Sequence, residues 1–254
     1  MSSTITSQIK GCRFVSWNVR GVNGAIKRGK VISHLKQLKV DICFLQETHL
    51  KASEILRIKR PWMSHVFHSK FDARARGAAI VISKNVTFEP TKSIEDPNGR
   101  FVAVSGRLFD IPVVLVSAYA PVWDDDKFIT HLFSSLPDVD SHYPIIGGDF
   151  NLIQDPDLDR SSSKPFTLSN SAMTLKSFTD RLGLSDPWRL SNPSTKAFSF
   201  FSHVHRSYSR IDFFLTDNRL LHWIDSSEYH SIVISDHAPT SIIMHFPNYR
   251  PPRT

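Results

Sequence analysis

The sequence predicts an α/β fold in which two β-sheets pack against each other and helices flank them. Short apolar runs bounded by turn residues are far more frequent than segments with helical spacing, which indicates a β-rich chain. Several of these runs end in a carboxylate, an amide or an imidazole, as strands do where a rigid sheet presents an active site. No internal repeat, low-complexity tract or long linker divides the chain, so we expect one domain over residues 1–246.

The expected elements follow from these patterns in chain order. Helical spacing of apolar residues predicts helices at 28–38, 127–136 and 168–182. Apolar and alternating runs predict strands at 12–18, 42–47, 65–68, 77–83, 101–108, 112–119, 144–149, 198–202, 210–215, 230–234 and 240–246. The proline-rich end at 247–254 is expected to begin a linker to a region downstream.

Composition narrows the class of protein. The 254 residues are 41% hydrophobic, which is enough for a sizeable core. No apolar run is long enough to cross a membrane and the first ten residues lack the apolar segment of a signal peptide, so we expect no membrane partner. The 2 cysteines are too few for a disulfide framework. A net charge of +7 favours a polyanionic partner such as nucleic acid or an anionic lipid surface, although ordinary variation also produces such a charge.

Asp149 and Asn151 follow the apolar run at 144–148. In an extended segment two such residues point to the same face, so the acid can take a proton while the amide fixes the nucleophile. The spacing alone also suits a tight turn after a strand, because Gly, Asp and Asn are common turn residues.

Glu47 and Asn18 end two other strand-like runs. Acids gathered at one site of a basic protein suggest a divalent cation held between protein and phosphate. Because Mg²⁺ takes only one or two protein carboxylates, Glu47 is a candidate ligand. A surface acid at Glu47 and a turn residue at Asn18 are the alternatives.

Asp212 and His237 form an acid and imidazole pair at further strand ends. A partner carboxylate fixes the tautomer of an imidazole and raises its affinity for a proton. Asp236 and His237 are adjacent, so they cannot both face Asp212 in a regular strand; one of them is expected to reach the metal or water and the other the phosphate. Taken alone, His237 is as well explained by a surface or core histidine.

Six motifs spread over most of the chain contain these strand-end residues: Trp17-Asn18-Val19-Arg20-Gly21, Leu45-Gln46-Glu47-Thr48, Ser117-Ala118-Tyr119-Ala120-Pro121, Gly147-Gly148-Asp149-Phe150-Asn151, Ser209-Arg210-Ile211-Asp212 and Ser235-Asp236-His237. Together and in this order they resemble the exonuclease–endonuclease–phosphatase superfamily, which includes DNase I-like nucleases. Within it the chain is most similar to the endonuclease domain of LINE-type (non-LTR) retrotransposons. The resemblance implies a four-layered α/β sandwich of two packed mixed sheets flanked by helices, with the site at one edge.

The resemblance also implies a role for each matching residue. Glu47 would bind Mg²⁺, with Mn²⁺ as the alternative ion, supported by Asn18 and Asp236. The implied catalytic roles are these: Asp149 orients or deprotonates the attacking water, Asn151 holds the water or the phosphate, His237 paired with Asp212 stabilises charge on the phosphate, and Tyr119 donates a hydrogen bond to the phosphate or the leaving oxygen. From the residues alone Tyr119 is a core aromatic at a strand end.

A polar segment between Phe201 and Ser209 has the length of a hairpin loop and a basic, aromatic tip. The resemblance implies a hairpin that probes the DNA minor groove, where width and deformability are read; a solvated hairpin is the alternative. Phosphate contacts would position the DNA without reading its sequence. The candidate DNA contacts are Ser199, His203, His205, Arg206, Tyr208, Ser209, Arg210, Arg20, Lys27 and Arg28, and for the helix residues among them surface charge is the alternative.

The sequence therefore predicts a Mg²⁺-dependent endonuclease that nicks one strand of double-stranded DNA, leaving a 3′-hydroxyl that primes reverse transcription. A reverse transcriptase region of the same polyprotein and a nuclear location are expected with it. The first alternative is an apurinic repair endonuclease, although such enzymes typically carry an acid where this chain has Arg20. A phosphoinositide phosphatase, a sphingomyelinase-type phosphoesterase and an inactive DNA-binding module are the others.

Overall fold

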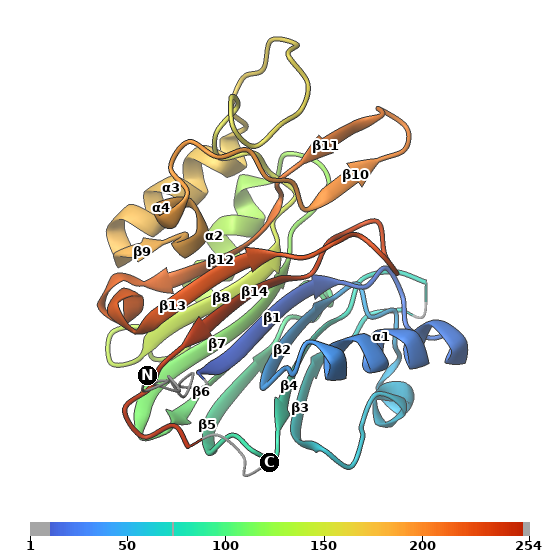
Figure 1. Ribbon diagram of the computed structural model, residues 1–254, viewed down its shortest axis with the longest axis vertical. Coiled ribbons are helices and arrows are strands. Elements are labelled where there is room, and N and C mark those ends of the chain that lie inside the picture. The colour runs from blue at the N-terminus through green and yellow to red at the C-terminus, as the bar shows by residue number, and fades with distance from the viewer. Residues whose placement is uncertain (1–10, 73, 251–254) are drawn as a thin grey trace, which may run out of the picture.

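Two six-stranded β-sheets pack face to face in the computed structural model, which describes residues 11–72 and 74–250 (Figure 1). The first sheet has the order β13 (Ile224–Tyr229), β14 (Thr240–Met244), β1 (Cys12–Asn18), β2 (Ile42–Gln46), β4 (Ala78–Ser83) and β3 (Met63–Ser69). The second has the order β5 (Phe88–Glu95), β6 (Phe101–Leu108), β7 (Ile111–Tyr119), β8 (Tyr143–Asp149), β12 (Asp212–Asp217) and β9 (Leu184–Ser185). A hairpin of β10 (Phe200–Ser202) and β11 (Ser207–Ser209) projects beyond them (Figure 1).

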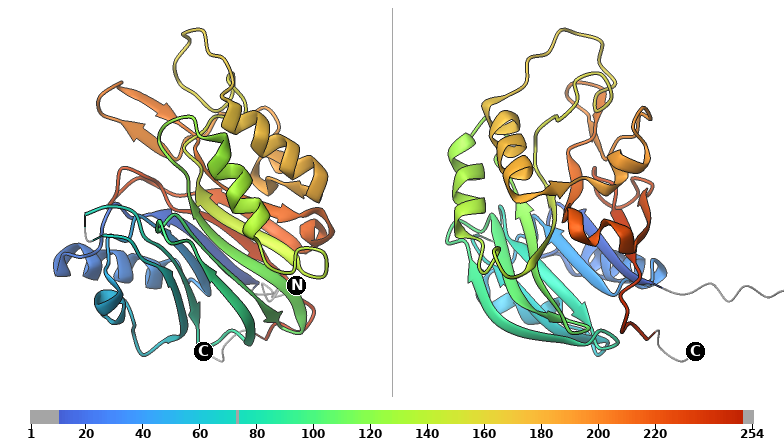
Figure 2. Two further views of the ribbon diagram at one scale, coloured as in Figure 1. Left: turned by 180° about the vertical axis from the view of Figure 1, so that it is seen from behind. Right: turned by 90° about the vertical axis from the view of Figure 1, so that its left-hand side faces the viewer.

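Helices cover the outer face of each sheet, so the molecule has four layers. Helix α1 (Ala25–Gln37) and the 3-10 turn η1 (Ala52–Arg57) lie over the first sheet, and α2 (Asp126–Ser135) and α3 (Asn170–Leu182) lie over the second (Figure 2). The short helix α4 (Pro187–Ser191) and the 3-10 turn η2 (Asn218–Trp223) flank β12 and β13. The predicted four-layered sandwich of two mixed sheets is confirmed.

Apolar alternation explains this layering. The inward residues of both sheets, such as Phe14, Phe44 and Phe214, form the central core between the sheets. The opposite faces of the same strands pack under the helices, where Val31 and Leu35 of α1 meet the first sheet. Strands buried on both faces read as continuous apolar runs, which is why the sequence reveals them clearly.

The strand directions gather several strand ends at one edge. The pairs β1 with β2 and β7 with β8 are parallel, so each pair ends at the same side of its sheet. The sheets also approach closely near this edge, since a Cβ atom on Gly147 of β8 would lie 2.9 Å from Phe44 and 3.0 Å from Ser16, both of which belong to the first sheet. Glycine at this position lets the two halves of the site come together.

One predicted strand is wrong. Residues 230–234 are irregular, and the strand that pairs with β14 is β13, just before them. The sequence of β13 is polar because the strand lies at the edge of its sheet, whereas the apolar run at 232–234 belongs to a loop in which the side chain of Val233 is 58% exposed. The exposed edge strand β5, the short β9, β11 and α4, and both 3-10 turns were also not predicted.

The chain continues to pack on the domain beyond residue 246. The ring of Tyr249 lies 5.2 Å from that of Phe109, and its hydroxyl is 3.5 Å from Asp41. Residues up to Tyr249 thus contact the domain, while a linker that begins at 247 stays a prediction, and its final part, 251–254, lies outside the described residues. Within the described residues, we find no helix with the length and apolar character needed to cross a membrane.

Candidate active site

Three predicted residues sit side by side at the edge of the second sheet. The strand register pairs Tyr119 of β7 with Asp149 of β8, and Asp149 with Asp212 of β12. The His237 Nδ1 atom is 2.8 Å from Asp212 Oδ2, and its Nε2 is 3.7 Å from Asp149 Oδ2. The second sheet therefore fixes the two acids, and the imidazole of His237, from the segment before β14, lies beside both of them in one buried row.

Asn18 joins this row to the other sheet. Its Nδ2 donates to Asp149 Oδ2 at 2.8 Å and to Glu47 Oε1 at 2.9 Å. Its Oδ1 accepts from the backbone N–H of Arg20 at 2.9 Å, and since that N–H can only donate, the orientation of the amide is fixed. Asn18 thus holds Glu47 and Asp149 together. The prediction that it ligates the metal is not supported, because its nitrogen and not its oxygen faces the carboxylates.

Glu47 is the ionised acid of the site. Burial acts to raise its pKa, but hydrogen bonds from His49, Asn18 and Tyr119 outweigh burial and lower that pKa to about 2. The backbone of Glu47 is left-handed, with φ of 50°, as are those of Arg20 at 45° and Asn151 at 50°. Such conformations cost roughly 1–3 kcal/mol for residues other than glycine, and they collect at functional sites.

Two aromatic side chains and two carboxylates surround His237. The indole Nε1 of Trp17 donates to the His237 carbonyl at 3.0 Å, and the ring of Phe200 lies 4.6 Å from the imidazole. Burial acts to lower the pKa of His237, but the carboxylates of Asp212 and Asp149 outweigh it and raise that pKa to about 9. The imidazole is therefore a buried cation at neutral pH.

Asp149 can exchange a proton near neutral pH, and Asp212 has a carboxylate oxygen without a hydrogen-bond partner. Burial raises the pKa of Asp149 to about 7, and the Asp212 carboxylate acts in the same direction. The Oδ1 atom of Asp212 is buried without a hydrogen-bond partner. A proton on Asp149 is consequently easy to take up and release near neutral pH, which suits a general base.

The donor set fits a hard divalent cation. The possible ligand atoms of Asp149, Asp212 and His237 all lie within 4.8 Å of one another, so these residues form a possible acidic metal site. A protonated imidazole has no lone pair to offer, however, and His237 is already paired with Asp212. Glu47 is ionised and only partly buried, so it is the better candidate ligand, with water and phosphate oxygens completing the coordination.

Asn151 lies next to this cluster. Its backbone N–H donates to Asp149 Oδ1 at 3.0 Å, and its Nδ2 donates to the Ala120 carbonyl at 2.9 Å. Asp236, the neighbour of His237, turns to a different partner: its Oδ2 is 2.5 Å from the Arg20 guanidinium. The structure thus brings Asn151 to the catalytic row. Asp236, which was predicted to bind the metal together with Glu47, is instead paired with Arg20.

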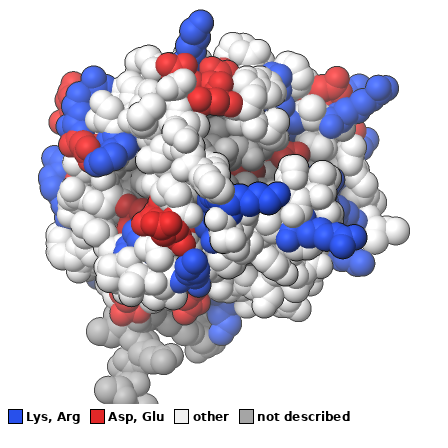
Figure 3. Space-filling model, turned by 90° about the horizontal axis from the view of Figure 1, so that it is seen from above, with Lys and Arg blue, Asp and Glu red and all other residues white. Residues whose placement is uncertain are grey.

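The predicted DNA contacts divide into exposed and buried groups. His203, His205, Arg206 and Tyr208 are exposed on the β10–β11 hairpin, and Ser209 is partly buried in β11. Lys and Arg side chains lie beside the hollow in the face seen from above (Figure 3). Lys27 and Arg28 lie near the start of α1 and bond to the segment before it. The Lys27 ammonium donates to the Arg20 carbonyl, and the Arg28 guanidinium donates to the Val22 and Asn23 carbonyls.

Ser199 and Arg210 cannot reach DNA from their places in the structure, and those two predictions need correction. Ser199 is 0% exposed, and its hydroxyl accepts from the backbone N–H groups of Ile211 and Asp212 at 3.0 Å each. Arg210 is 1% exposed and pairs with Asp159 and Asp186. Both therefore support the strand that carries Asp212.

The sequence did not predict two supporting residues, Gln46 and Trp17, although both lie within the motifs that resemble the family. Gln46 Nε2 donates to the hydroxyls of Ser16 and Ser117 at 3.1 Å each, which ties the two sheets together beneath the site. Trp17 fixes the backbone of His237 as described above. A buried polar residue inside an apolar strand run was the available signal for Gln46, because such a group needs partners.

The site is a hydrolytic one: an acid suited to act as a base, a buried imidazolium and an ionised carboxylate converge at one edge of the sandwich. The chain belongs to the Endonuclease/Exonuclease/phosphatase family, whose model matches residues 15–237. This confirms the predicted class, a nuclease hydrolase.

Curated relatives agree with the predicted resemblance. The chain is 28% identical over 236 residues to the transposon TX1 uncharacterized 149 kDa protein of Xenopus laevis, covering 89% of this chain but only 18% of that protein. It is 24% identical over 256 residues to an exodeoxyribonuclease of Bacillus subtilis (strain 168), covering 91% of this chain and 99% of the relative.

Solved structures share the fold. The catalytic domain of Xenopus laevis APE2 superposes with a TM-score of 0.76 at 20% identity, covering 91% of each chain. The AP endonuclease LMAP of Leishmania major gives 0.73 at 20% identity, covering 94% of this chain and 89% of the other. The predicted DNase I-like architecture is confirmed.

Proposed function

We propose that the protein is a Mg²⁺-dependent DNA endonuclease that hydrolyses one phosphodiester of double-stranded DNA to a 3′-hydroxyl and a 5′-phosphate. The observation that carries the proposal is the Asn18 bridge, which holds the ionised Glu47 beside the buried row of Asp149 and His237. Mg²⁺ would be held by Glu47, or Mn²⁺ in its place, and when bound it would neutralise charge on the phosphate.

The residues of the chain divide the chemistry between them. Asp149, whose pKa is raised by burial to about 7, takes the proton of the attacking water, and Asn151 orients that water or the phosphate. His237 stays protonated between Asp212 and Asp149, so its Nε2–H can stabilise the charge that builds up on the phosphate. Burial raises the pKa of Tyr119, so the phenol remains a neutral donor; its hydroxyl donates to Glu47 in the structure and would turn to the phosphate or the leaving oxygen when substrate binds.

The hairpin supports DNA as the substrate over a small phosphoester. Its strands continue from the site, since Phe200 forms a bridge with His237 and the Phe201 N–H donates to the Asp236 carbonyl at 3.2 Å. The exposed tip between Ser202 and Ser207 carries two histidines and an arginine. Such a projection can enter a groove of the duplex while the scissile phosphate occupies the site.

We infer that the nick serves retrotransposition. The 28% identity to a transposon protein of which this chain spans only 18% supports a longer polyprotein. In this proposal a reverse transcriptase region of that polyprotein extends the new 3′-hydroxyl, the protein acts in the nucleus, and the residues after Tyr249 lead toward the downstream region.

Supercoiled plasmid provides the test. With Mg²⁺ we expect open circles, no open circles in EDTA, and resealing by a DNA ligase, which requires a 3′-hydroxyl and a 5′-phosphate. Without the cation the acids repel the phosphate. The Asp149→Asn variant is the matched control for contaminating nucleases.

A depurinated plasmid distinguishes the alternative. Cutting confined to the depurinated substrate would identify an apurinic repair endonuclease and refute the retrotransposon proposal. Full activity in EDTA would refute the metal requirement. Activity on small phosphoesters with intact plasmid untouched would place the chain among the phosphatases of its family.

A further inference from the structure

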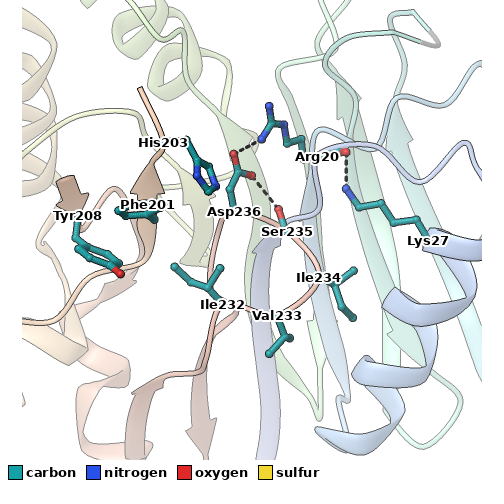
Figure 4. Close-up of a pocket in the computed structure, with 10 residues that line it drawn as sticks. All are labelled: Arg20, Lys27, Phe201, His203, Tyr208, Ile232, Val233, Ile234, Ser235 and Asp236. Carbon is teal, nitrogen blue, oxygen red and sulfur yellow. Dashed lines mark hydrogen bonds and ion pairs between the residues drawn. The ribbon is translucent and has the colours of Figure 1, made fainter. Parts of the chain in front are cut away.

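Asp236 is fully engaged by groups of the chain itself. Its Oδ2 lies 2.5 Å from the Arg20 guanidinium, and its Oδ1 accepts from the Ser235 hydroxyl at 3.3 Å (Figure 4). The Asp236 side chain is 14% exposed, so the ion pair is shielded on the acid's side, whereas the Arg20 side chain is 60% exposed. The arginine therefore neutralises Asp236 and still presents N–H groups to solvent.

The position of Arg20 is built into the backbone. Its N–H donates to Asn18 Oδ1, its carbonyl accepts from the Lys27 ammonium at 2.8 Å, and the next N–H, from Gly21, donates to the Glu47 carbonyl at 2.7 Å. Its φ of 45° is costly for a residue with a side chain and is maintained by these bonds. The same segment thus positions Asn18, the guanidinium and the Glu47 backbone together.

Electrostatics oppose a cation shared by Glu47 and Asp236. Burial lowers the pKa of Lys27, and that pKa also responds to the charges of Asp236, Arg20 and Glu47, so Lys27 lies within electrostatic reach of all three groups. A divalent ion placed on Asp236 would need to displace the guanidinium and then sit close to both it and Lys27. Like charges at such short range are strongly unfavourable. The Glu47 carboxylate accepts hydrogen bonds from His49, Asn18 and Tyr119. Arg74, Arg76 and Arg100 line the same pocket, but within the described residues none of them forms an ion pair with Glu47.

We propose that the Arg20 guanidinium occupies the cation position at Asp236, so that the chain binds a single divalent ion through Glu47 and uses Arg20 as a fixed positive charge toward the substrate phosphates. This replaces the sequence prediction that Asp236 is a metal ligand, and it rests on the proposed function only for the role of the substrate. In a duplex, a guanidinium at this place would contact the backbone and would position the strand without reading bases.

Metal binding tests the proposal without any cleavage. We would titrate the DNA-free chain with Mn²⁺ and follow the free ion by electron paramagnetic resonance. The parental protein should bind one ion, Asp236→Asn should bind it within about twofold of the parent, and Glu47→Gln should weaken binding by roughly tenfold or more, the scale of altering a metal site. Urea unfolding of each variant confirms that it is folded.

Removing the guanidinium of Arg20 should free the Asp236 carboxylate to bind a metal ion. Arg20→Met should tighten Mn²⁺ binding by roughly fivefold or more, a usual size for coupling between two sites. In that background Asp236→Asn should reverse the gain. Lys30→Met on the exposed surface of α1 removes the same charge and is the matched control, expected to change Mn²⁺ affinity by less than about twofold because exposed charges at a distance are screened.

Three results would overturn the inference: two ions bound by the parental chain, a tenfold loss of affinity in Asp236→Asn alone, or unchanged affinity in Glu47→Gln. A chain that binds one Mn²⁺ in the predicted pattern but fails to nick plasmid would refute the proposed function and leave this inference standing.

Discussion

Two buried polar clusters adjoin the start of β12, and they differ in how completely their groups are paired. In the first, Asp149 and Asp212 flank His237, Asp212 Oδ1 has no partner, and Asp149 lies 3.7 Å from the imidazole. In the second, Arg210 spans two acids. Its Nε and Nη2 reach Asp159 at 2.6 and 3.1 Å, and its Nη1 pairs with Asp186 and lies 3.3 Å from the Tyr229 hydroxyl.

The difference separates a working site from a structural support. In the Arg210 cluster each acid is paired with a guanidinium, as buried charges must be when they only hold a fold together. The Asp149 cluster keeps two acids close together without full compensation, and together with burial this raises the pKa of Asp149. Tyr229 connects the two, because its hydroxyl donates to the Asp212 carbonyl at 2.7 Å.

The test with the largest expected effect removes the buried guanidinium of Arg210. Arg210→Met should lower the free energy of unfolding by roughly 3–5 kcal/mol, because it leaves two buried carboxylates uncompensated. Urea denaturation with an unchanged slope would measure the loss. Arg189→Met is the control: its side chain, 19% exposed, also pairs with Asp159, and its removal should cost clearly less. A loss below about 1 kcal/mol for Arg210→Met would contradict the structural role.

The second test affects activity and spares stability. His237→Ala and Asp149→Asn should each slow plasmid nicking by at least about a hundredfold, the scale of a lost general base or charge-stabilising group, with DNA affinity within a few-fold. Asp149→Asn should also leave the unfolding free energy equal or higher, since it removes a buried charge. The exposed His222→Ala is the matched control. Nicking at the parental rate in either variant would refute the role of that residue.

Replacing Ser199 should lower stability by less than replacing Arg210, and it should lower activity by less than replacing His237. Ser199→Ala should cost about 1–3 kcal/mol of stability, because the N–H groups of Ile211 and Asp212 lose their buried acceptor. Nicking should fall only modestly, through a small displacement of Asp212. The comparison is with the exposed Ser134→Ala, which should be neutral. Reduced DNA affinity with unchanged stability would instead restore Ser199 to the DNA interface.

The hairpin should affect the choice of target and not the chemistry. Replacing residues 203–206 with Asn-Gly, a two-residue turn that keeps Ser202 opposite Ser207, should scatter the nick positions while the nicking rate persists. Sequencing the nicks maps this directly, and binding should remain salt-sensitive in both proteins. An identical nick map would move target choice to other surface loops.

Local sequence patterns could predict those site residues that lie next to an apolar, strand-like run. Asp149, Asp212 and His237 each follow or precede an apolar run, and their convergence follows from the register of three neighbouring strands and the segment before β14. The orientation of Asn18 could not be predicted, because it depends on a bond to the Arg20 backbone. The Arg20–Asp236 pair joins residues 216 positions apart, beyond the reach of any local pattern.

Burial explains the remaining errors. Ser199 and Arg210 belong to a motif with exposed neighbours, and sequence alone does not tell which of these alternating residues faces inward. The strand expected at 230–234 failed for the opposite reason, since Ile232 and Val233 are apolar but line an open pocket beside Phe201 (Figure 4). Apolar character indicates burial on average, and exposed apolar residues beside a binding groove are the exception to that rule.

The pairing of Cys12 with Met244 in β1 and β14 has a consequence for synthesis. The first strand of the described domain remains without one neighbour until the last has left the ribosome, and His237 arrives only with that last segment. An elongating chain therefore carries Glu47 and Asp149 long before it can cut. Since domains generally fold as units during translation, the nuclease should become active abruptly once β14 is released.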